Sequence, residues 1–368
     1  MGRNPAHRAA TRGGSSLSRA SPRLALLALL AVAALALAAA APEPAAKRVD
    51  PAARLAPQGS ACEYWDLVAR LDSKHRVFAR FMITNQGPGT RTALATGHLV
   101  QPDGTVVPFH NGRRWGRWKL GPERLRVEIG SSLLDLRGPV RRFAVDKRKK
   151  GIQIRLDYSP GQPRALREAR GPGAYTIDLL ELAEPVEGSV WVAGMAEPLA
   201  VRGTIAVTHT RMEQGEPDLA LRRIDVLSLD SEQGLFLSEL TTPGGERSRW
   251  LVLRHQDQFV FDSGDFELRP EAVTPPGGDP GYPIPRALLL RSPEIEGEIR
   301  LGRVLAQHDP LQALPQPFRL LLSFEMRPRR VWMDALMEVR LNADAEHPTL
   351  HVRGSGIASV TYLNPLSS

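Results

Sequence analysis

The sequence predicts an almost entirely β-structured protein made of two tandem β-domains. Short β-rich runs such as "RVFARFMITN", "IQIRLDY" and "TIAVTH" alternate with turn sequences such as "GPG" and "PDG". Beyond residue 41, no stretch keeps a helical apolar period for three turns. A faint repeat with an offset of 141 lays residues 94–109 on 235–250 and 125–129 on 266–270. We therefore expect domains at 60–205 and 206–368.

The strands alternate as a sheet with one wet face requires. In "GIQIRLDYS", Ile152, Ile154, Leu156 and Tyr158 fall on one face, and the polar residues between them fall on the other. Long antiparallel strands of this kind close into barrels or pack as sandwiches. A barrel leaves no exposed sheet edge, which suits an exported chain.

The first 41 residues have the pattern of a signal peptide. Five arginines and no acid precede residues 24–41, which contain only Leu, Ala and Val and end in a run of alanines. We expect cleavage near residue 41 and export to the periplasm or beyond. A second interpretation keeps the segment as a membrane anchor, because its eighteen apolar residues just reach spanning length. Residues 42–59, rich in Ala and Pro, predict a disordered linker.

Cysteine content and charge exclude several classes of protein. Cys62 is the only cysteine, so no internal disulfide forms and the fold depends on core burial. Pairing of Cys62 with another chain and burial as a small apolar residue both stay open. Without the targeting segment, 43 basic residues face 40 acidic ones, a net charge of +3 that does not favour a nucleic-acid partner. The basic run 146–151 predicts a solvated hairpin tip.

Three short motifs resemble one known family. The stretch "YWDLVARLDSKHRVFARFMITNQGPGTRTALATGHLVQPDG" opens with an aromatic strand, continues to Thr-Asn-x-Gly and closes on Asp-Gly. Arg202-Gly203 followed by His209 is the second motif, and the glycine-rich closing strand "GSGIASVTYLN" is the third. Over about residues 60–365 the chain resembles the AttH-like and carotenoid 1,2-hydratase (hydroxyneurosporene synthase) family. The resemblance implies two tandem lipocalin-like (calycin) barrels, whose interior can hold one apolar ligand.

The resemblance also implies a test for catalysis. The hydratases of the family have a His-x-Trp pair and then a Tyr-x-Asp pair, which fall here on 209–211 and 236–238. Only His209 is retained, and hydrating an alkene requires an acid that stays protonated near neutral pH. Glu213, Asp225 and Glu239 are replacement acids or solvated strand-edge charges. Without a clear proton donor, binding without catalysis is the preferred hypothesis.

Other candidate sites follow from residue types. We expect His209, Trp191, Met195, Phe236 and Trp250 to line a ligand cavity, because inward aromatic residues line the interior of a barrel and an indole N–H can meet a polar head group. For each tryptophan the alternative is core packing, and for His209 it is a structural hydrogen bond at a strand end. No metal or cofactor is expected. The histidines are scattered, His347 and His351 have Pro348 between them, and nucleophile-elbow and phosphate-loop motifs are absent.

Three functional hypotheses remain at this stage. The first is an exported protein that binds a lipid, isoprenoid or carotenoid-like molecule near the domain junction. The second is a hydro-lyase that adds water to a carotenoid-type alkene, with an acid near His209. The third is a structural or interaction protein with filled barrels. The partner of the first hypothesis is an apolar small molecule or lipid, and association with a membrane surface and the oligomeric state stay open.

Overall fold

The computed structural model describes most of the chain beyond residue 48. The described residues are 49–54, 56–57, 59–85, 91–161, 175–256, 258–271, 273, 281–313, 316, 319–320, 323, 327–342 and 349–365. The expected signal peptide, residues 1–41, and the first part of the expected linker lie outside them. Both sheets described below belong to one compact unit of the chain.

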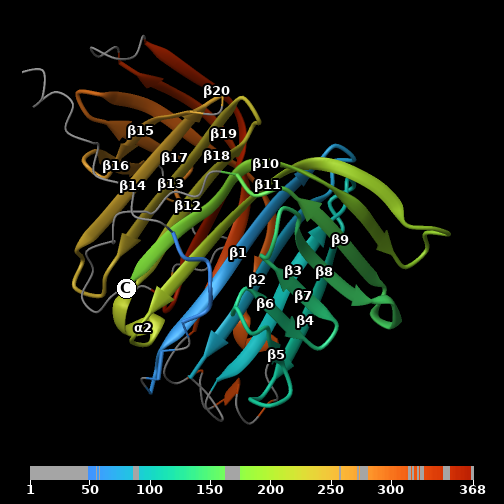
Figure 1. Ribbon diagram of the computed structural model, residues 1–368. Coiled ribbons are helices and arrows are strands. Elements are labelled where there is room, and N and C mark those ends of the chain that lie inside the picture. The colour runs from blue at the N-terminus through green and yellow to red at the C-terminus, as the bar shows by residue number, and fades with distance from the viewer. Residues whose placement is uncertain are drawn as a thin grey trace, which may run out of the picture. The chain divides into compact units, whose positions relative to one another are not determined.

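The first sheet is a curled antiparallel half-barrel of eleven strands within the described residues (Figure 1). β1 pairs with β2 on one side and with β11 on the other, so the last strand returns to the first. The order across the sheet is β4-β3-β2-β1-β11-β10-β9-β8-β7-β6-β5. The strands are β1 (Cys62–Leu71), β2 (Arg76–Thr84), β3 (Thr92–Val100), β4 (Val106–Arg113), β5 (Lys119–Leu120), β6 (Arg126–Ile129), β7 (Ser132–Asp135), β8 (Arg141–Lys147), β9 (Ile152–Tyr158), β10 (Thr176–Val192) and β11 (Leu199–Met212).

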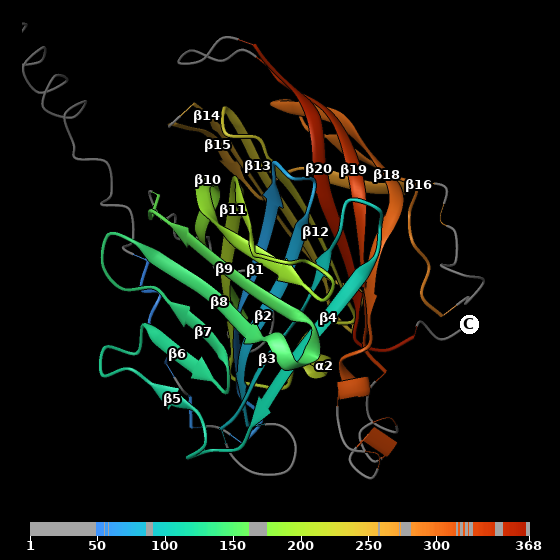
Figure 2. The ribbon, with the colours of Figure 1, turned by 90° about the vertical axis from the view of Figure 1, so that its right-hand side faces the viewer.

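The second sheet is a curled antiparallel half-barrel of nine described strands (Figure 2). Its first strand, β12, pairs with β13 and with the last strand, β20. The order is β15-β14-β13-β12-β20-β19-β18-β17-β16. The strands are β12 (Arg222–Leu229), β13 (Gln233–Thr241), β14 (Arg247–His255), β15 (Gln258–Ser263), β16 (Glu267–Glu271), β17 (Ala287–Arg291), β18 (Ile295–His308), β19 (Arg329–Leu341) and β20 (Leu350–Tyr362).

The two sheets follow one plan, which confirms the predicted fold class of two tandem lipocalin-like β-domains. In each sheet the first strand pairs with the second and with the last. By this plan β12 is the counterpart of β1. The repeat with an offset of 141 instead lays the β3–β4 hairpin on β13–β14, one strand out of phase, because any two hairpins with similar turns match in pattern. The first sheet ends at Met212 and the second begins at Arg222, whereas the expected boundary at 205/206 lies inside β11.

Buried apolar side chains form three layers. One layer covers the inner face of the first sheet, one lies between the sheets, and one covers the inner face of the second sheet. Alternate residues of β1 and of β12 belong to different layers, because successive side chains point to opposite faces of a strand. These two strands are therefore buried on both faces. The predicted wet face is confirmed in β9, where Ile152, Ile154, Leu156 and Tyr158 are buried and the residues between them are not.

The segment from Val49 to Arg54 packs against the first sheet where β1 begins. Val49 and Ala53 are buried in the first layer. The Ala53 N–H donates to the Arg124 carbonyl at 2.9 Å, and the Trp65 indole donates to the Pro51 carbonyl at 3.3 Å. At these positions the structure has a packed segment instead of the expected disordered linker, because small apolar side chains fit the end of the layer.

Helical elements are short. The 3₁₀ helix η1 (Arg148–Lys150) lies exposed at the β8–β9 turn, and Gly151 follows it with a φ of 82°, which confirms the predicted hairpin tip. The helix α2 (Glu216–Leu219) lies in the link between the two sheets, and η3 (Pro310–Ala313) follows β18. Among the described residues, no helix is long and apolar enough to cross a membrane.

Candidate functional site

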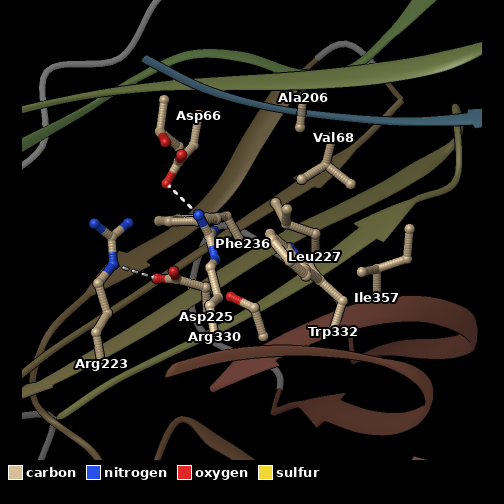
Figure 3. A pocket seen from close by; sticks show the side chains of 12 residues that line it. Asp66, Val68, Ala206, Arg223, Asp225, Leu227, Phe236, Arg330, Trp332 and Ile357 are labelled. Atoms are coloured by element: carbon tan, nitrogen blue, oxygen red, sulfur yellow. Dashed lines mark hydrogen bonds and ion pairs between the residues drawn. The ribbon is translucent and has the colours of Figure 1, made fainter. Parts of the chain in front are cut away.

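A small cavity lies between the two sheets, and we call it the inter-sheet cavity. Strands β1 and β11 form one wall, and β12, β13, β19 and β20 form the other. Its volume is about 20 Å³, which is room for about one water molecule. In Figure 3 the charged side chains gather at one end of the cavity and the apolar ones at the other. The lining residues are Asp66, Val68, Ala206, Thr208, Arg223, Asp225, Leu227, Phe236, Arg330, Trp332, Ile357 and Ser359.

Asp66 on β1 anchors the charged end. Arg80 of β2 donates two hydrogen bonds to its carboxylate, both of 2.7 Å, and Arg330 of β19 donates a third of 3.1 Å from the opposite sheet. Asp66 and Arg330 are 6% and 8% exposed. Burial alone would raise the pKa of Asp66, but the guanidinium groups of Arg330 and Arg80 outweigh it and hold the pKa well below its usual range. The carboxylate is therefore an anion that joins the sheets.

Arg223 on β12 forms the second link at this end. Its Nε donates to Asp225 Oδ1 at 2.8 Å, and the same oxygen accepts a 2.7 Å hydrogen bond from Ser238. Its Nη1 reaches across to the first sheet, where Thr210 Oγ1 and Tyr64 Oη accept at 3.1 Å. Arg223 is 4% exposed. A buried guanidinium with this many acceptors is well satisfied, and it holds β12 against β1 and β11.

A tyrosine pair extends this network away from the cavity. The hydroxyl oxygens of Tyr64 and Tyr175 lie 3.2 Å apart, and Tyr64 donates to Glu216 Oε1 of α2 at 2.6 Å. The Arg80 guanidinium lies 3.6 Å from the centre of the Tyr64 ring. Burial and then Glu216 raise the pKa of Tyr64 well above its ordinary value, and burial raises the pKa of Tyr175 to about 12. Both hydroxyls are therefore neutral and act as hydrogen-bonding groups near neutral pH.

The apolar end is built from large side chains of both sheets. Phe236 of β13 is buried, and Trp332 of β19 stacks on Phe78 of β2 with ring centres 5.0 Å apart. The Trp332 indole N–H is buried without a hydrogen-bond partner among the described residues. Val68, Leu227 and Ile357 complete this end. A cavity with one charged and one apolar end suits a molecule that has both characters.

Comparison with solved protein structures identifies the fold. No protein-family model matches the chain, and no curated protein sequence matches it. A crystal structure of a protein from Nitrosomonas europaea, proposed to be an AttH, has a TM-score of 0.62 and 15% identity over 88% of this chain and 100% of that one. The chain has the AttH-like fold. CghA with Sch210972 (TM-score 0.56, 12% identity, 87% and 96% covered) and kievitone hydratase from Nectria haematococca (0.54, 11%, 84% and 90%) are also similar.

Two of the predicted ligand-lining residues lie at or beside the inter-sheet cavity. Phe236 lines it, and Trp250 contacts Phe236 edge to face, with ring centres 5.1 Å apart. The Trp250 indole donates to Asp262 at 2.9 Å. These two aromatic residues face the first sheet, not the interior of the second.

His209 lies on the other face of β11, inside the first sheet. Its ring is fully buried and stacks on Trp65, with ring centres 4.4 Å apart. Nε2 lies 3.5 Å from Glu63 Oε2, and neither ring nitrogen has a hydrogen-bond partner among the described residues. Burial lowers the pKa of His209, so the ring is neutral. Its neighbours Thr208 and Thr210 face the second sheet instead.

Trp191 and Met195 lie apart from both of these places. Trp191, near the end of β10, is half-buried, and its indole donates to the Met195 carbonyl at 2.9 Å. The Arg148 guanidinium lies 5.5 Å from the Trp191 ring. Met195 packs on the edge of the first layer. The structure therefore divides the five predicted residues among three places.

The acids weighed as proton donors are also separated. Glu239 is fully buried between Arg222 and Arg249, at 3.1 and 2.9 Å, on the inner face of the second sheet. Glu213 is exposed at the end of β11, and only Asp225 lines the inter-sheet cavity. His347 lies outside the described residues. Within the described ranges no group of three or more His, Cys, Asp or Glu residues could hold a metal ion.

Sequence reasoning missed Asp66, Arg223, Arg330 and Trp332. Asp66 stands inside the apolar run "YWDLV" and Arg223 stands beside the largely apolar run "IDVLSL", whereas the strand of Arg330 carries several other charges. An apolar run buries its charges, and buried charges need partners. The sequence could therefore indicate that such a charge is buried, but it could not indicate which strands supply its partners.

Proposed function

We propose that the protein binds a small amphipathic molecule in the inter-sheet cavity. The polar group of the ligand lies toward Arg223 and Arg330, and its apolar part lies toward Phe236 and Trp332. The observation that carries the proposal is the division of one cavity into a charged and an apolar end, with walls from both sheets. Lipids, isoprenoids and carotenoid-like molecules with a polar group belong to this class.

Binding requires the apolar end to open. A volume of about 20 Å³ holds a water molecule but not a lipid. The charged end is joined by directional ion pairs between the sheets, whereas the apolar end is joined by non-directional contacts such as Trp332 on Phe78. Side chains at the apolar end therefore move first, and the charged end keeps the sheets in register.

The similar structures agree with this proposal. CghA is described with Sch210972, so a protein of this fold accommodates a small molecule. At 12% identity the ligand itself is not transferred to this chain.

A hydro-lyase is the second candidate. A water-sized cavity beside the carboxylates of Asp66 and Asp225 favours it, and a kievitone hydratase has the same fold. Protonating an alkene needs an acid that is protonated near neutral pH, whereas Arg330 and Arg80 keep Asp66 ionised. Binding is therefore our first proposal and catalysis our second.

The binding test uses the amphipathic anion 8-anilinonaphthalene-1-sulfonate as its probe. In the variant Leu227→Trp the apolar end is filled, and we expect the affinity for the probe to fall about tenfold or more. Leu336→Trp is the matched control, because Leu336 is 59% exposed on β19 and is not among the described lining residues. Equal affinities in the two folded variants would contradict the proposal. Native mass spectrometry of protein purified without detergent then identifies any natural ligand.

Turnover of a polyene decides between binding and catalysis. Under the second candidate, water addition is lost in Asp225→Asn while probe binding remains. Under the first, the wild-type protein binds but adds no water.

We also propose that the mature protein is exported, with cleavage near residue 41. The mass of the protein isolated from its own host tests this, because retention of residues 1–41 would indicate an anchor.

A further inference from the structure

A second cavity lies at the end of the first sheet where β1 begins and β11 ends, and we call it the end cavity. Its volume is about 270 Å³, close to the lower limit of small-molecule sites. Among the described residues, it shares no lining residue with the inter-sheet cavity. The lining residues are Arg54, Ala56, Ala61, Cys62, Glu63, Ile83, Asn85, Arg91, Thr176, Arg211, Met212 and Glu213.

Three arginines face this cavity, and they differ in their partners. Arg211 is paired with Asp178, and its pKa is lowered by burial. The guanidinium groups of Arg54 and Arg91 form no ion pair with a carboxylate among the described residues. Arg54 comes from the packed segment before β1, and Arg91 immediately precedes β3. Two cationic groups from different segments thus line one cavity.

Arg91 is held in place by aromatic residues. Its guanidinium lies 5.0 Å from the centre of the Trp115 ring, and its carbonyl accepts a 2.8 Å hydrogen bond from the Trp118 indole. Trp115 is 51% exposed and contacts Trp118 edge to face. A guanidinium that stacks on an aromatic face keeps its N–H edge free to donate two parallel hydrogen bonds to a carboxylate.

Two acidic residues, Glu63 and Glu213, line the cavity beside these cations. Glu63 turns inward, where its Oε2 accepts the Arg54 backbone N–H at 3.0 Å and lies 3.5 Å from His209. Glu213 is exposed at the rim. The His209 ring that Glu63 contacts is fully buried and is not part of the described lining.

The rest of the lining is apolar. Ile83 and Met212 are buried, and burial raises the pKa of Cys62, so its thiol is neutral. An anionic group at Arg54 and Arg91 can therefore coexist with a short apolar part against these side chains.

We propose that the end cavity binds a small organic monocarboxylate. The carboxylate accepts hydrogen bonds from Arg54 and Arg91, and the apolar part packs on Ile83 and Met212. This site is independent of the inter-sheet cavity, so either can exist without the other.

The experiment titrates benzoate and follows the ¹⁵N indole signals of Trp115 and Trp118, assigned with the Trp115→Phe and Trp118→Phe variants. We expect both signals to shift with saturation, while the Trp332 signal stays unchanged. Benzyl alcohol, which lacks the charge, and sodium chloride at the same ionic strength serve as ligand controls, and neither should reproduce the shifts. Shifts with chloride alone would identify an anion site without organic selectivity and would overturn the proposal.

Variants then locate the carboxylate. Arg54→Gln combined with Arg91→Gln should weaken benzoate binding about tenfold or more, because two charge-assisted hydrogen bonds are lost. Arg117→Gln is the matched control, since it removes one exposed charge from the loop of Trp115 without touching the lining. Unchanged affinity in the double variant, with an unfolding temperature equal to that of the control, would overturn the proposal. So would a benzoate response confined to Trp332.

Discussion

The two faces of β11 handle buried polar side chains in opposite ways. On the outer face, Thr208 lines the inter-sheet cavity and Thr210 accepts a hydrogen bond from Arg223 of the second sheet. On the inner face, His209 stacks on Trp65 and neither ring nitrogen has a partner in the described ranges. Polar groups on the outer face therefore join two sheets, whereas the imidazole on the inner face fills space as a neutral ring.

The two faces differ in how much folding stability the protein would lose if one of their buried polar side chains were replaced. A buried ion pair contributes little net stability compared with apolar residues, but removing one partner leaves an uncompensated buried charge. Replacing a buried neutral ring that makes no hydrogen bonds leaves no donor or acceptor unsatisfied. The two faces should thus respond very differently to conservative substitutions.

The largest effect is expected for Asp66→Asn. The change leaves Arg80 and Arg330 without their shared carboxylate at the interface of the sheets. We expect the free energy of unfolding to fall by about 3–5 kcal/mol, measured by chemical denaturation.

Glu338→Gln is the matched control for Asp66→Asn. It breaks the pair with Arg353 on the exposed face of the second sheet, where the two side chains are 54% and 71% exposed. Such a surface pair is worth at most about 1 kcal/mol. If the two variants lost equal stability, the charged end would not be the link between the sheets.

Sequence patterns predicted the strands well because they depend on local chemistry. Turn residues and alternation in "GIQIRLDYS" set β9 and its hairpin, and the structure has them where expected. The resemblance in the opening strands also led to the correct fold class. These features can be predicted without knowing which strands pair with one another.

The facing of β11 could not be predicted in the same way. When the polar residues of a strand all lie on one face, that face can be expected to point toward water. β11 gives no such signal, because it is buried on both faces from Ile205 to Thr210. A shift by one residue exchanges the two faces of a strand. The face on which His209 lies could therefore not be derived from the alternation of this strand. The partners of Asp66 were equally hidden, since Arg330 is 264 positions away.

A fall in pH is expected to have an intermediate effect on folding stability, because histidines lie at the same interface between the sheets. His98 of β3 and His308 of β18 meet across the sheets with ring centres 5.2 Å apart. Burial and then Arg330 lower the pKa of His98 to about 4, and burial and then His98 lower that of His308 to about 3. The unfolded chain, with an ordinary pKa of 6.5, takes up protons first as the pH falls. Stability is thus lost between pH 6.5 and pH 4, by up to about 3 kcal/mol for His98 alone.

The dependence on pH is checked by denaturation at a series of pH values. His98→Gln removes the titrating group, so its curve should be flatter than that of the wild type over this window. His351→Gln, at an exposed position of β20, should leave the slope unchanged. A slope that is the same in all three proteins would show that the histidines at the interface do not couple folding to protonation.

The smallest effect should come from the inner face of β11, with His209→Phe. A phenyl ring keeps the stack on Trp65 and strands no hydrogen-bond partner, so the free energy of unfolding should change by less than about 1 kcal/mol. Thr210→Val, one position along the strand, takes an acceptor from the buried guanidinium of Arg223 and should cost about 1–2 kcal/mol. Urea denaturation at pH 8 compares the two while the histidines are neutral. A larger loss for His209→Phe than for Thr210→Val would mean that Glu63 or a bound water holds the imidazole, and that the inner face also depends on directional bonds.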